Sequence, residues 1–143
     1  MNAYVDSSVL LRFVFGEPGR LHEWPKVTRA LSSELIRVEC LRTVDRARIQ
    51  LGLDEGDVAE KRADVLGRLQ AFDLVRIDAR VLERAAEPFP TLVRSLDAIH
   101  LATAILARKD VPELVFATHD GNLANAARAE GFSVLGDERV HPR

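Results

Sequence analysis

Ala3-Tyr4-Val5-Asp6-Ser7-Ser8 is a short apolar run that ends in an acid and two serines. This order is typical of a buried strand that passes directly into a helix, because apolar residues favour the strand and serine side chains can cap the helix. We therefore predict a strand over residues 2–5, followed by a helix that Ser7 or Ser8 caps and that ends near Phe15. Strands that lead into helices are the repeating unit of α/β folds.

The rest of the chain repeats this alternation of short apolar runs and amphipathic stretches. Further strands are predicted over residues 72–77, 114–117 and 132–135. Further helices are predicted over residues 34–51, 54–70, 78–87, 96–108 and 121–129, with a short helical segment over 20–30. The helices over 34–51 and 54–70 would form a hairpin, since Gly52 stops the first and Asp54 begins the second. The whole pattern predicts an α/β fold with a largely parallel sheet, in a single domain over residues 1–143.

Four acids occupy positions where a carboxylate is unfavourable for folding. Asp6 ends the first strand, and Asp120 closes the apolar run that begins at Leu114. Glu39 interrupts the apolar face of one predicted helix, and Asp97 lies in the first turn of another. Ligands of open α/β sheets bind beyond the carboxyl ends of the strands, so all four side chains could reach one crevice there.

Carboxylates gathered near a core repel one another and resist desolvation unless a cation neutralises them. For a set of oxygen ligands the simplest such cation is a hard divalent metal, Mg²⁺ or Mn²⁺. A divalent metal activates water and stabilises charge on an attacked phosphate. The four acids therefore indicate metal-assisted chemistry on a phosphate group.

The charge balance permits a nuclease without requiring one. The formal net charge of −2 argues against a general nucleic-acid binder, but the four acids are part of a total of 22 Asp and Glu residues. Without these four, 18 acids remain against 20 Lys and Arg residues, which leaves a mildly basic surface around an acidic centre. A phosphate-bearing substrate could approach such a centre once a metal has inverted its charge.

Cysteine content and hydropathy indicate the compartment. The single cysteine, Cys40, excludes an intrachain disulfide and a thiolate metal cluster, which suits a reducing environment. No apolar run approaches the roughly 20 residues of a membrane span, and no signal peptide is visible at the N-terminus. We expect a cytoplasmic protein that does not associate with a membrane.

Four segments of the chain each carry one of the acids. They are Tyr4-Val5-Asp6-Ser7-Ser8, Ser32-Ser33-Glu34-Leu35-Ile36-Arg37-Val38-Glu39, Leu96-Asp97-Ala98-Ile99-His100-Leu101-Ala102-Thr103-Ala104 and Phe116-Ala117-Thr118-His119-Asp120-Gly121-Asn122-Leu123-Ala124-Asn125-Ala126-Ala127. In this order they resemble the PIN-domain nucleases, and in particular the VapC toxins of bacterial toxin–antitoxin pairs. The resemblance covers nearly the whole chain, although the hairpin around residues 45–70 matches only in general character.

The resemblance implies a three-layer α/β/α fold with a mostly parallel central sheet and a protruding helical hairpin. It also implies an endoribonuclease toxin that depends on Mg²⁺, for which Mn²⁺ could substitute. Asp6, Asp97 and Asp120 resemble the metal-binding aspartates of the family, with Glu39 as the fourth acid of the catalytic set. Glu39 or Asp120 would accept the proton of a metal-activated water. The implied partners are RNA, a VapB-like antitoxin and a second copy of the chain in a homodimer.

Three side chains near the acids are expected to assist them or to pack against them. Thr118 lies two residues before Asp120 on the same side of an extended strand, so its hydroxyl could point at the site, and the family often has a hydroxyl there. Ser7 would cap the first helix or contribute a hydroxyl to the site. His100 follows Asp97 by one helical turn, and we expect it to be packed and hydrogen-bonded rather than to bind the metal.

Two other functions use similar features. A receiver-like phosphoacceptor domain also places acids around Mg²⁺, but it usually has adjacent acids after its first strand and a lysine after a late strand. Here Asp6 stands between Val5 and Ser7, and no lysine follows Lys109. A non-catalytic PIN scaffold that binds RNA or protein is the second alternative, and the four intact acids disfavour it.

Overall fold

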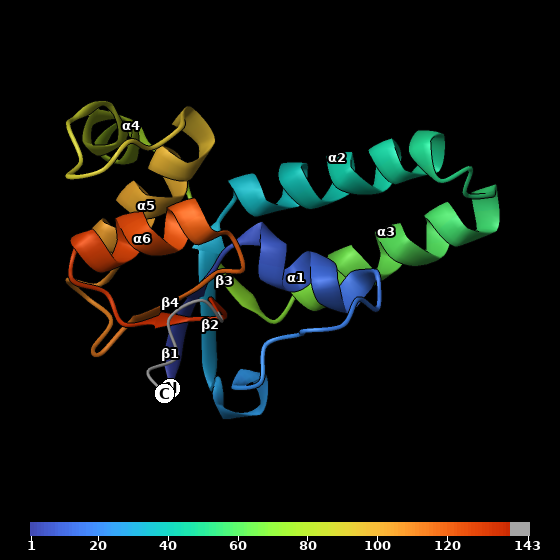
Figure 1. Cartoon of the computed structure of the whole chain (residues 1–143), viewed down its shortest axis with the longest axis horizontal. Coiled ribbons are helices and arrows are strands. Elements are labelled where there is room, and N and C mark those ends of the chain that lie inside the picture. Colours follow the sequence, from blue (N-terminus) through green and yellow to red (C-terminus); the bar gives the residue numbers. More distant parts are fainter. Residues whose placement is uncertain (138–143) are drawn as a thin grey trace.

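The computed structural model describes residues 1–137, and in it a parallel five-stranded sheet is covered by helices on both faces (Figure 1). In chain order the elements are β1 (Asn2–Val5), α1 (Ser7–Val14), a 3-10 turn η1 (Trp24–Lys26), β2 (Arg29–Ser33), α2 (Leu35–Gln50), α3 (Glu55–Leu69), β3 (Phe72–Val75), α4 (Ala79–Ala86), α5 (Ser95–Ala107), β4 (Val115–Ala117), α6 (Gly121–Ala129) and β5 (Val134–Leu135). The predicted domain extends to residue 143, and residues 138–143 lie outside the described part.

The sheet has the order β3-β2-β1-β4-β5, and every neighbouring pair is parallel. Strand β1 pairs with β2 on one side and with β4 on the other. The chain runs outward from β1 to β2 and β3 and then returns to β4 and β5 on the other side of β1, which makes the β1/β4 junction a topological switch point. In open parallel sheets a crevice forms at this point beyond the carboxyl ends of the strands.

Two apolar cores lie on opposite faces of the sheet because successive residues of a strand point to opposite sides. On one face Val5 packs with residues of α1, α2 and α3, such as Val9 and Val44. On the other face Tyr4 packs with residues of α5 and α6, such as Leu101 and Leu123. The predicted three-layer α/β/α arrangement with a parallel sheet is confirmed.

The helices α2 and α3 pack against each other and extend well beyond the edge of the sheet, as the long green pair in Figure 1 shows. Asp54 caps α3 by accepting a hydrogen bond from the backbone N–H of Asp57 (2.7 Å), as its position after Gly52 predicted. The protruding helical hairpin is therefore confirmed. Within residues 1–137, none of the helices combines the length and apolar character that a membrane crossing needs.

The short helical segment predicted over residues 20–30 is wrong for most of its length. Only Trp24–Lys26 form a turn of 3-10 helix, and Arg29–Ser33 form the strand β2. The run Arg-Ala-Leu-Ser-Ser has little intrinsic preference for a strand, but it pairs with β1 and β3 on its two sides. Pairing on both edges, rather than local propensity, makes this segment a strand.

The cap of α1 also differs from the prediction. Neither Ser7 nor Ser8 is the N-cap residue, because Asp6 holds that position and accepts from the backbone N–H of Ser8. Aspartate is as good an N-cap as serine, and its charge also favours the helix N-terminus. Asp6 therefore has a structural role in addition to any role in chemistry.

Candidate metal centre

The four acids come from four elements that meet at the carboxyl edge of the sheet. Asp6 directly follows β1, and Asp120 follows β4 by three residues, so these two flank the switch point. Glu39 lies in α2 and Asp97 in the first turn of α5. Asp6 is buried, Glu39 and Asp97 are half-buried, and Asp120 is exposed. The solvent exposure of the acids therefore increases across the site, from Asp6 in the interior to Asp120 at the surface.

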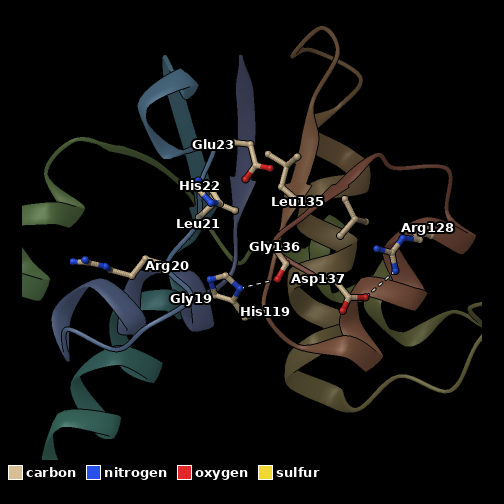
Figure 2. Close-up of a pocket in the computed structure, with 11 residues that line it drawn as sticks. Gly19, Arg20, Leu21, His22, Glu23, His119, Arg128, Leu135, Gly136 and Asp137 are labelled. Atoms are coloured by element: carbon tan, nitrogen blue, oxygen red, sulfur yellow. Dashed lines mark hydrogen bonds and ion pairs between the residues drawn. The ribbon is translucent and has the colours of Figure 1, made fainter. Parts of the chain in front are cut away.

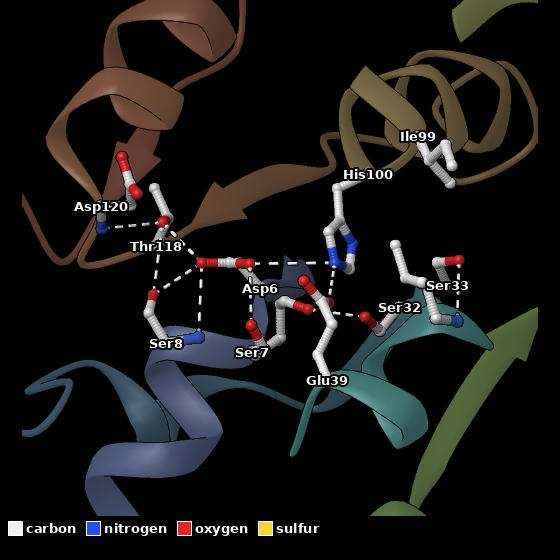
Figure 3. Close-up of polar contacts among 12 residues, drawn as sticks. Asp6, Ser7, Ser8, Ser32, Ser33, Glu39, Ile99, His100, Thr118 and Asp120 are labelled. Carbon is white, nitrogen blue, oxygen red and sulfur yellow. Dashed lines mark hydrogen bonds and ion pairs between the residues drawn. The ribbon is translucent and has the colours of Figure 1, made fainter. Parts of the chain in front are cut away.

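Asp6 is held by hydroxyl groups from the first turn of α1 and from the residue that follows β4 (Figure 3). Its Oδ2 accepts hydrogen bonds from Ser8 Oγ (2.6 Å) and Thr118 Oγ1 (2.9 Å), and its Oδ1 accepts a longer one from Ser7 Oγ (3.4 Å). The backbone N–H of Asp6 donates to the carbonyl of Ala117 (3.0 Å). These contacts fix the orientation of a carboxylate that is only 4% exposed.

His100 joins Asp6 to Glu39 beneath the mouth of the site. Its Nε2 is hydrogen-bonded to Glu39 Oε1 and lies 3.9 Å from Asp6 Oδ1, while its Nδ1 lies 2.7 Å from Tyr4 Oη. One ligand atom from each of Asp6, Glu39 and His100 falls within 4.8 Å of the others. The expectation of a packed and hydrogen-bonded histidine is confirmed, since His100 has no exposed surface.

Asp97 and Asp120 are outside this tight group of three and line a pocket of about 280 Å³ with Arg94 and Asn122. Asp120 uses Oδ1 to cap α6, accepting from the backbone N–H groups of Asn122 (2.9 Å) and Leu123 (3.0 Å). Its own N–H donates to Thr118 Oγ1 (3.0 Å). The hydroxyl of Thr118 thus links the capping loop of Asp120 to the carboxylate of Asp6.

The chain as a whole is similar to known proteins. The PIN domain family model matches residues 3–129, a range that includes all four acids. The chain is 35% identical to Ribonuclease VapC46 of Mycobacterium tuberculosis over 137 residues, which cover 92% of this chain and 95% of the relative. It is 36% identical to Ribonuclease VapC35 (92% and 94% covered) and 33% identical to Ribonuclease VapC47 (90% and 92% covered) of the same species.

The chain belongs to the VapC family of PIN domains. Since the matches cover at least 90% of its length, they are not restricted to the short acidic segments. The predicted family is confirmed.

The electrostatics of this VapC-family site show that its negative charge is poorly compensated. Burial, followed by the charges of Asp6 and Asp120, raises the pKa of Asp97 to about 6. Burial alone would lower the pKa of His100, but the hydrogen bond with Glu39 and the charges of Asp6, Glu39 and Asp97 outweigh it and raise that pKa. The contributions of the neighbouring acids to both shifts indicate a negative local potential.

The donor set fits a hard divalent cation. Among residues 1–137, no Lys or Arg forms an ion pair with any of the four acids, and His100 is the only basic side chain in contact with Asp6 and Glu39. Carboxylate oxygens are the preferred ligands of Mg²⁺ and Mn²⁺. A divalent cation would relieve the repulsion that raises the pKa of Asp97.

The sequence did not predict the contacts that two residues, Ser8 and Tyr4, make in the site. Ser8, rather than Ser7, makes the shorter hydrogen bond to Asp6, and it also accepts from the backbone N–H of His119 (2.9 Å). Its position is the signal, because Ser8 is the second residue after the N-cap Asp6, and an N-cap side chain reaches the residues two and three positions on. Tyr4 was predicted only as a strand residue, and no local pattern shows that its hydroxyl reaches His100.

The turn after β5 packs against the loop that carries Thr118 and His119. Gly136 has a φ of +94°, and a Cβ at this position would lie 2.6 Å from the carbonyl oxygen of Thr118. Its own carbonyl is hydrogen-bonded to His119 Nδ1 (2.8 Å) beside a pocket of about 210 Å³, which Figure 2 shows. The loop from Thr118 to Asp120 therefore rests on a glycine that no other residue can replace without strain.

We predict that Gly136→Ala lowers the free energy of unfolding by about 1–3 kcal/mol, because the methyl group adds a backbone clash to an unfavourable φ. Urea unfolding followed by circular dichroism measures the change. The matched control is Gly67→Ala in α3, where a Cβ meets nothing within 4 Å and alanine should stabilise the helix by about 0.5–1 kcal/mol. Equal stability of the Gly136→Ala variant and the wild type would contradict the prediction.

Proposed function

We propose that this chain is a Mg²⁺-dependent endoribonuclease toxin that hydrolyses phosphodiester bonds in RNA. The observation that carries the proposal is the group of four acids at the β1/β4 switch point, which no Lys or Arg of residues 1–137 neutralises. The names of the relatives, Ribonuclease VapC46, VapC47 and VapC35, support the choice of RNA as the substrate. Mn²⁺ would substitute for Mg²⁺, since both prefer oxygen ligands.

In this proposal the four acids, Asp6, Glu39, Asp97 and Asp120, form the cation site. A divalent cation held there supplies positive charge to the attacked phosphate and acidity to a nearby water. Thr118, Ser8 and Ser7 hold the Asp6 carboxylate in one orientation by their hydrogen bonds. Either Glu39 or Asp120 would take the proton of the attacking water.

Grooves on both sides of Asp120 support an RNA substrate. One groove, of about 490 Å³, lies between α1 and α2 and is lined by Arg12, Arg46 and Phe15 among others. The other is the 280 Å³ pocket that contains Arg94. Asp120 lines both, so a single strand could run past the acids with arginines near its phosphates and an aromatic ring for a base.

We predict that Arg46→Ala weakens RNA binding and lowers the slope of log affinity against log salt concentration by about 0.7, the value for one phosphate contact to a single strand. Arg46 is exposed and forms no ion pair within residues 1–137, so its charge is available to RNA. Fluorescence anisotropy with a single-stranded RNA, in an Asp97→Asn background that prevents cleavage, measures the slope.

The matched control for Arg46→Ala is Arg37→Ala. Arg37 is an exposed arginine of the same helix α2, but it lines a different pocket with Leu66, Leu69 and Leu74. Its removal should leave the salt slope nearly unchanged. If both variants lowered the slope equally, the groove beside Asp120 would have no special role in RNA binding.

The partners implied by the VapC family complete the proposal. A VapB-like antitoxin would inhibit the chain by placing a basic side chain among the acids, where no Lys or Arg of residues 1–137 is ion-paired. An antitoxin that inhibited equally well without its basic residues would count against this model. A homodimer is proposed as well, supported by exposed apolar surface at Leu82, Leu92 and Leu96. The single cysteine, which is buried, is compatible with the reducing cytoplasm.

The experiment that tests the function is incubation of the purified chain with total cellular RNA in Mg²⁺ or Mn²⁺, with EDTA as the control. The expected result is a small set of discrete fragments that appear only with the metal, and sequencing of their ends would identify the cleaved RNA. If the chain bound Mn²⁺ but left all RNA intact, the proposal of a ribonuclease would be replaced by that of a non-catalytic PIN scaffold.

A further inference from the structure

Beneath the acidic centre, a buried hydrogen-bonded chain runs from Tyr4 through His100 to Glu39. Tyr4 and His100 have no exposed surface, and Tyr4 stacks on Phe116 with ring centroids 5.2 Å apart. These hydrogen bonds join four elements. Tyr4 lies in β1, His100 in α5 and Glu39 in α2. In addition, Tyr4 Oη accepts from the backbone N–H of Ser33 at the end of β2 (3.1 Å). None of the roles assigned to the four acids uses Tyr4 or His100.

The direction of each hydrogen bond follows from what the groups can donate. The carboxylate of Glu39 only accepts, so His100 Nε2 carries the hydrogen that is shared with Oε1. In the neutral ring, Nδ1 is then an acceptor, and the hydroxyl of Tyr4 supplies its proton at 2.7 Å. Tyr4 can donate because its contact with the Ser33 N–H uses a lone pair and not the hydroxyl hydrogen. In the neutral ring Tyr4 thereby selects the tautomer that donates to Glu39. In the imidazolium, which the raised pKa of His100 favours, both ring nitrogens donate, and Nε2 again donates to Glu39.

The hydrogen bonds from Tyr4 through His100 hold Glu39 in a position that repulsion between carboxylates disfavours. Glu39 is half-buried, and its carboxylate shares the cluster with Asp6, so repulsion would drive the side chain toward solvent. The bond from His100 occupies Oε1, while Oε2 has no hydrogen-bond partner within residues 1–137. Figure 3 shows dashed lines from the ring of His100 to the carboxylates of both Glu39 and Asp6. The remaining oxygen of Glu39 is thus directed by a rigid, buried partner.

We propose that Tyr4 and His100 are positioning residues that hold the Glu39 carboxylate against Asp6 and so raise the affinity of the site for a divalent cation. The inference rests on the proposed function for the identity of the cation site and extends it to two residues outside the set of acids. Hydrogen-bond partners of metal ligands contribute to metal affinity because they fix the ligand before the metal arrives, and their loss typically costs about 10–100-fold.

The test measures Mn²⁺ affinity by isothermal titration calorimetry in Tyr4→Phe, His100→Leu and His100→Gln. Tyr4→Phe keeps the ring that stacks on Phe116 and removes only the hydroxyl, and we expect affinity to fall about tenfold. His100→Leu should lower it by about 10–100-fold. His100→Gln should recover much of this loss, because its amide N–H can replace the donor to Glu39. Raising Mn²⁺ to saturation should restore RNA cleavage in Tyr4→Phe.

The matched control is Val65→Ala, a truncation in the core formed by α1, α2 and α3 that touches neither Tyr4 nor His100. This substitution lowers the stability of the protein but leaves the hydrogen bonds from Tyr4 through His100 to Glu39 in place, so Mn²⁺ affinity should stay at the wild-type value. Unchanged affinity in Tyr4→Phe and His100→Leu, or an equal loss in Val65→Ala, would overturn the proposal. Wild-type affinity in Tyr4→Phe together with equal losses in His100→Gln and His100→Leu would also overturn it, since the imidazole would then be a direct ligand.

Failure of this inference can be distinguished from failure of the proposed function. Mn²⁺ affinity is measured without RNA. If the protein binds Mn²⁺ but cleaves no RNA, the affinities of the variants therefore still show whether Tyr4 and His100 position Glu39. A wild-type chain that bound no Mn²⁺ would overturn the inference and the metal-dependent part of the proposed function together.

Discussion

Replacement of Asp97 by asparagine is expected to reduce RNA cleavage by at least about 10²–10³-fold, the loss that follows removal of one preorganised electrostatic group from an active site. Asp97 lines the same pocket as Asp120 and interacts electrostatically with Asp6 and Glu39. In the proposed mechanism it is a ligand of the cation, and an amide oxygen is a weaker ligand than a carboxylate. Cleavage of a defined RNA, followed over time at saturating Mg²⁺, measures the loss.

The same variant should not be less stable than the wild type in the absence of metal. Burial and the charges of Asp6 and Asp120 penalise ionised Asp97, so a neutral amide removes a source of repulsion. We therefore expect an equal or higher Tm for Asp97→Asn in EDTA. This combination of lost activity and retained stability separates a role in chemistry from a role in folding.

The matched control for Asp97→Asn is Asp73→Asn, which changes the net charge equally. Asp73 is exposed on β3 and forms a surface ion pair with Arg29 (2.7 Å). Such pairs contribute about 0–1 kcal/mol, so cleavage should remain close to that of the wild type. If Asp97→Asn retained full activity, the acids at the switch point would not form the catalytic site.

Cation binding is expected to weaken by about tenfold per pH unit as the pH falls below about 6, because a carboxyl must lose its proton before it binds a metal. The pKa of Asp97 in the metal-free protein is raised to about 6 from an ordinary value of 3.8, through burial and the charges of Asp6 and Asp120. Above about 6 this carboxyl is ionised, and its proton no longer competes with the cation. Calorimetric titration of Mn²⁺ between pH 5 and pH 8 measures the dependence.

The stability of the metal-free protein should change with pH in the opposite sense. Because the folded state binds the Asp97 proton more tightly than the unfolded state does, the contribution of this group to stability is complete below its ordinary pKa. That contribution is lost as the pH rises from about 4 to about 6. Added Mn²⁺ should consequently raise the Tm at pH 7.5 and have a much smaller effect at pH 5.

Asp97→Asn provides the control for the pH dependence, since its residual Mn²⁺ affinity should lack the component that titrates near pH 6. A dissociation constant that stayed constant from pH 5 to pH 8 in the wild type would contradict the assignment of Asp97 as a cation ligand.

The features that the sequence predicted correctly depend on neighbouring residues in the chain. Asp54 caps α3 because an N-cap bonds to an N–H only three residues away. The acids at strand ends were also recognisable, since Asp6 follows an apolar run and Asp120 closes another. Strands that lead into helices then placed both acids at the carboxyl edge of a parallel sheet. Local chemistry and the parallel direction of the strands in α/β units are sufficient for these conclusions.

The tertiary structure alone decided which groups touch. Strand β2 forms because β1 and β3 pair with both of its edges, although its residues have weak strand propensity. The bond from Thr118 to Asp6 spans 112 residues, that from Tyr4 to His100 spans 96, and that from His100 to Glu39 spans 61. No periodicity or cap pattern encodes contacts at such separations, because they depend on how the two faces of the sheet pack around the switch point. For this reason the sequence alone could indicate the acids of the site, whereas the packed fold determined the hydrogen bonds that orient them.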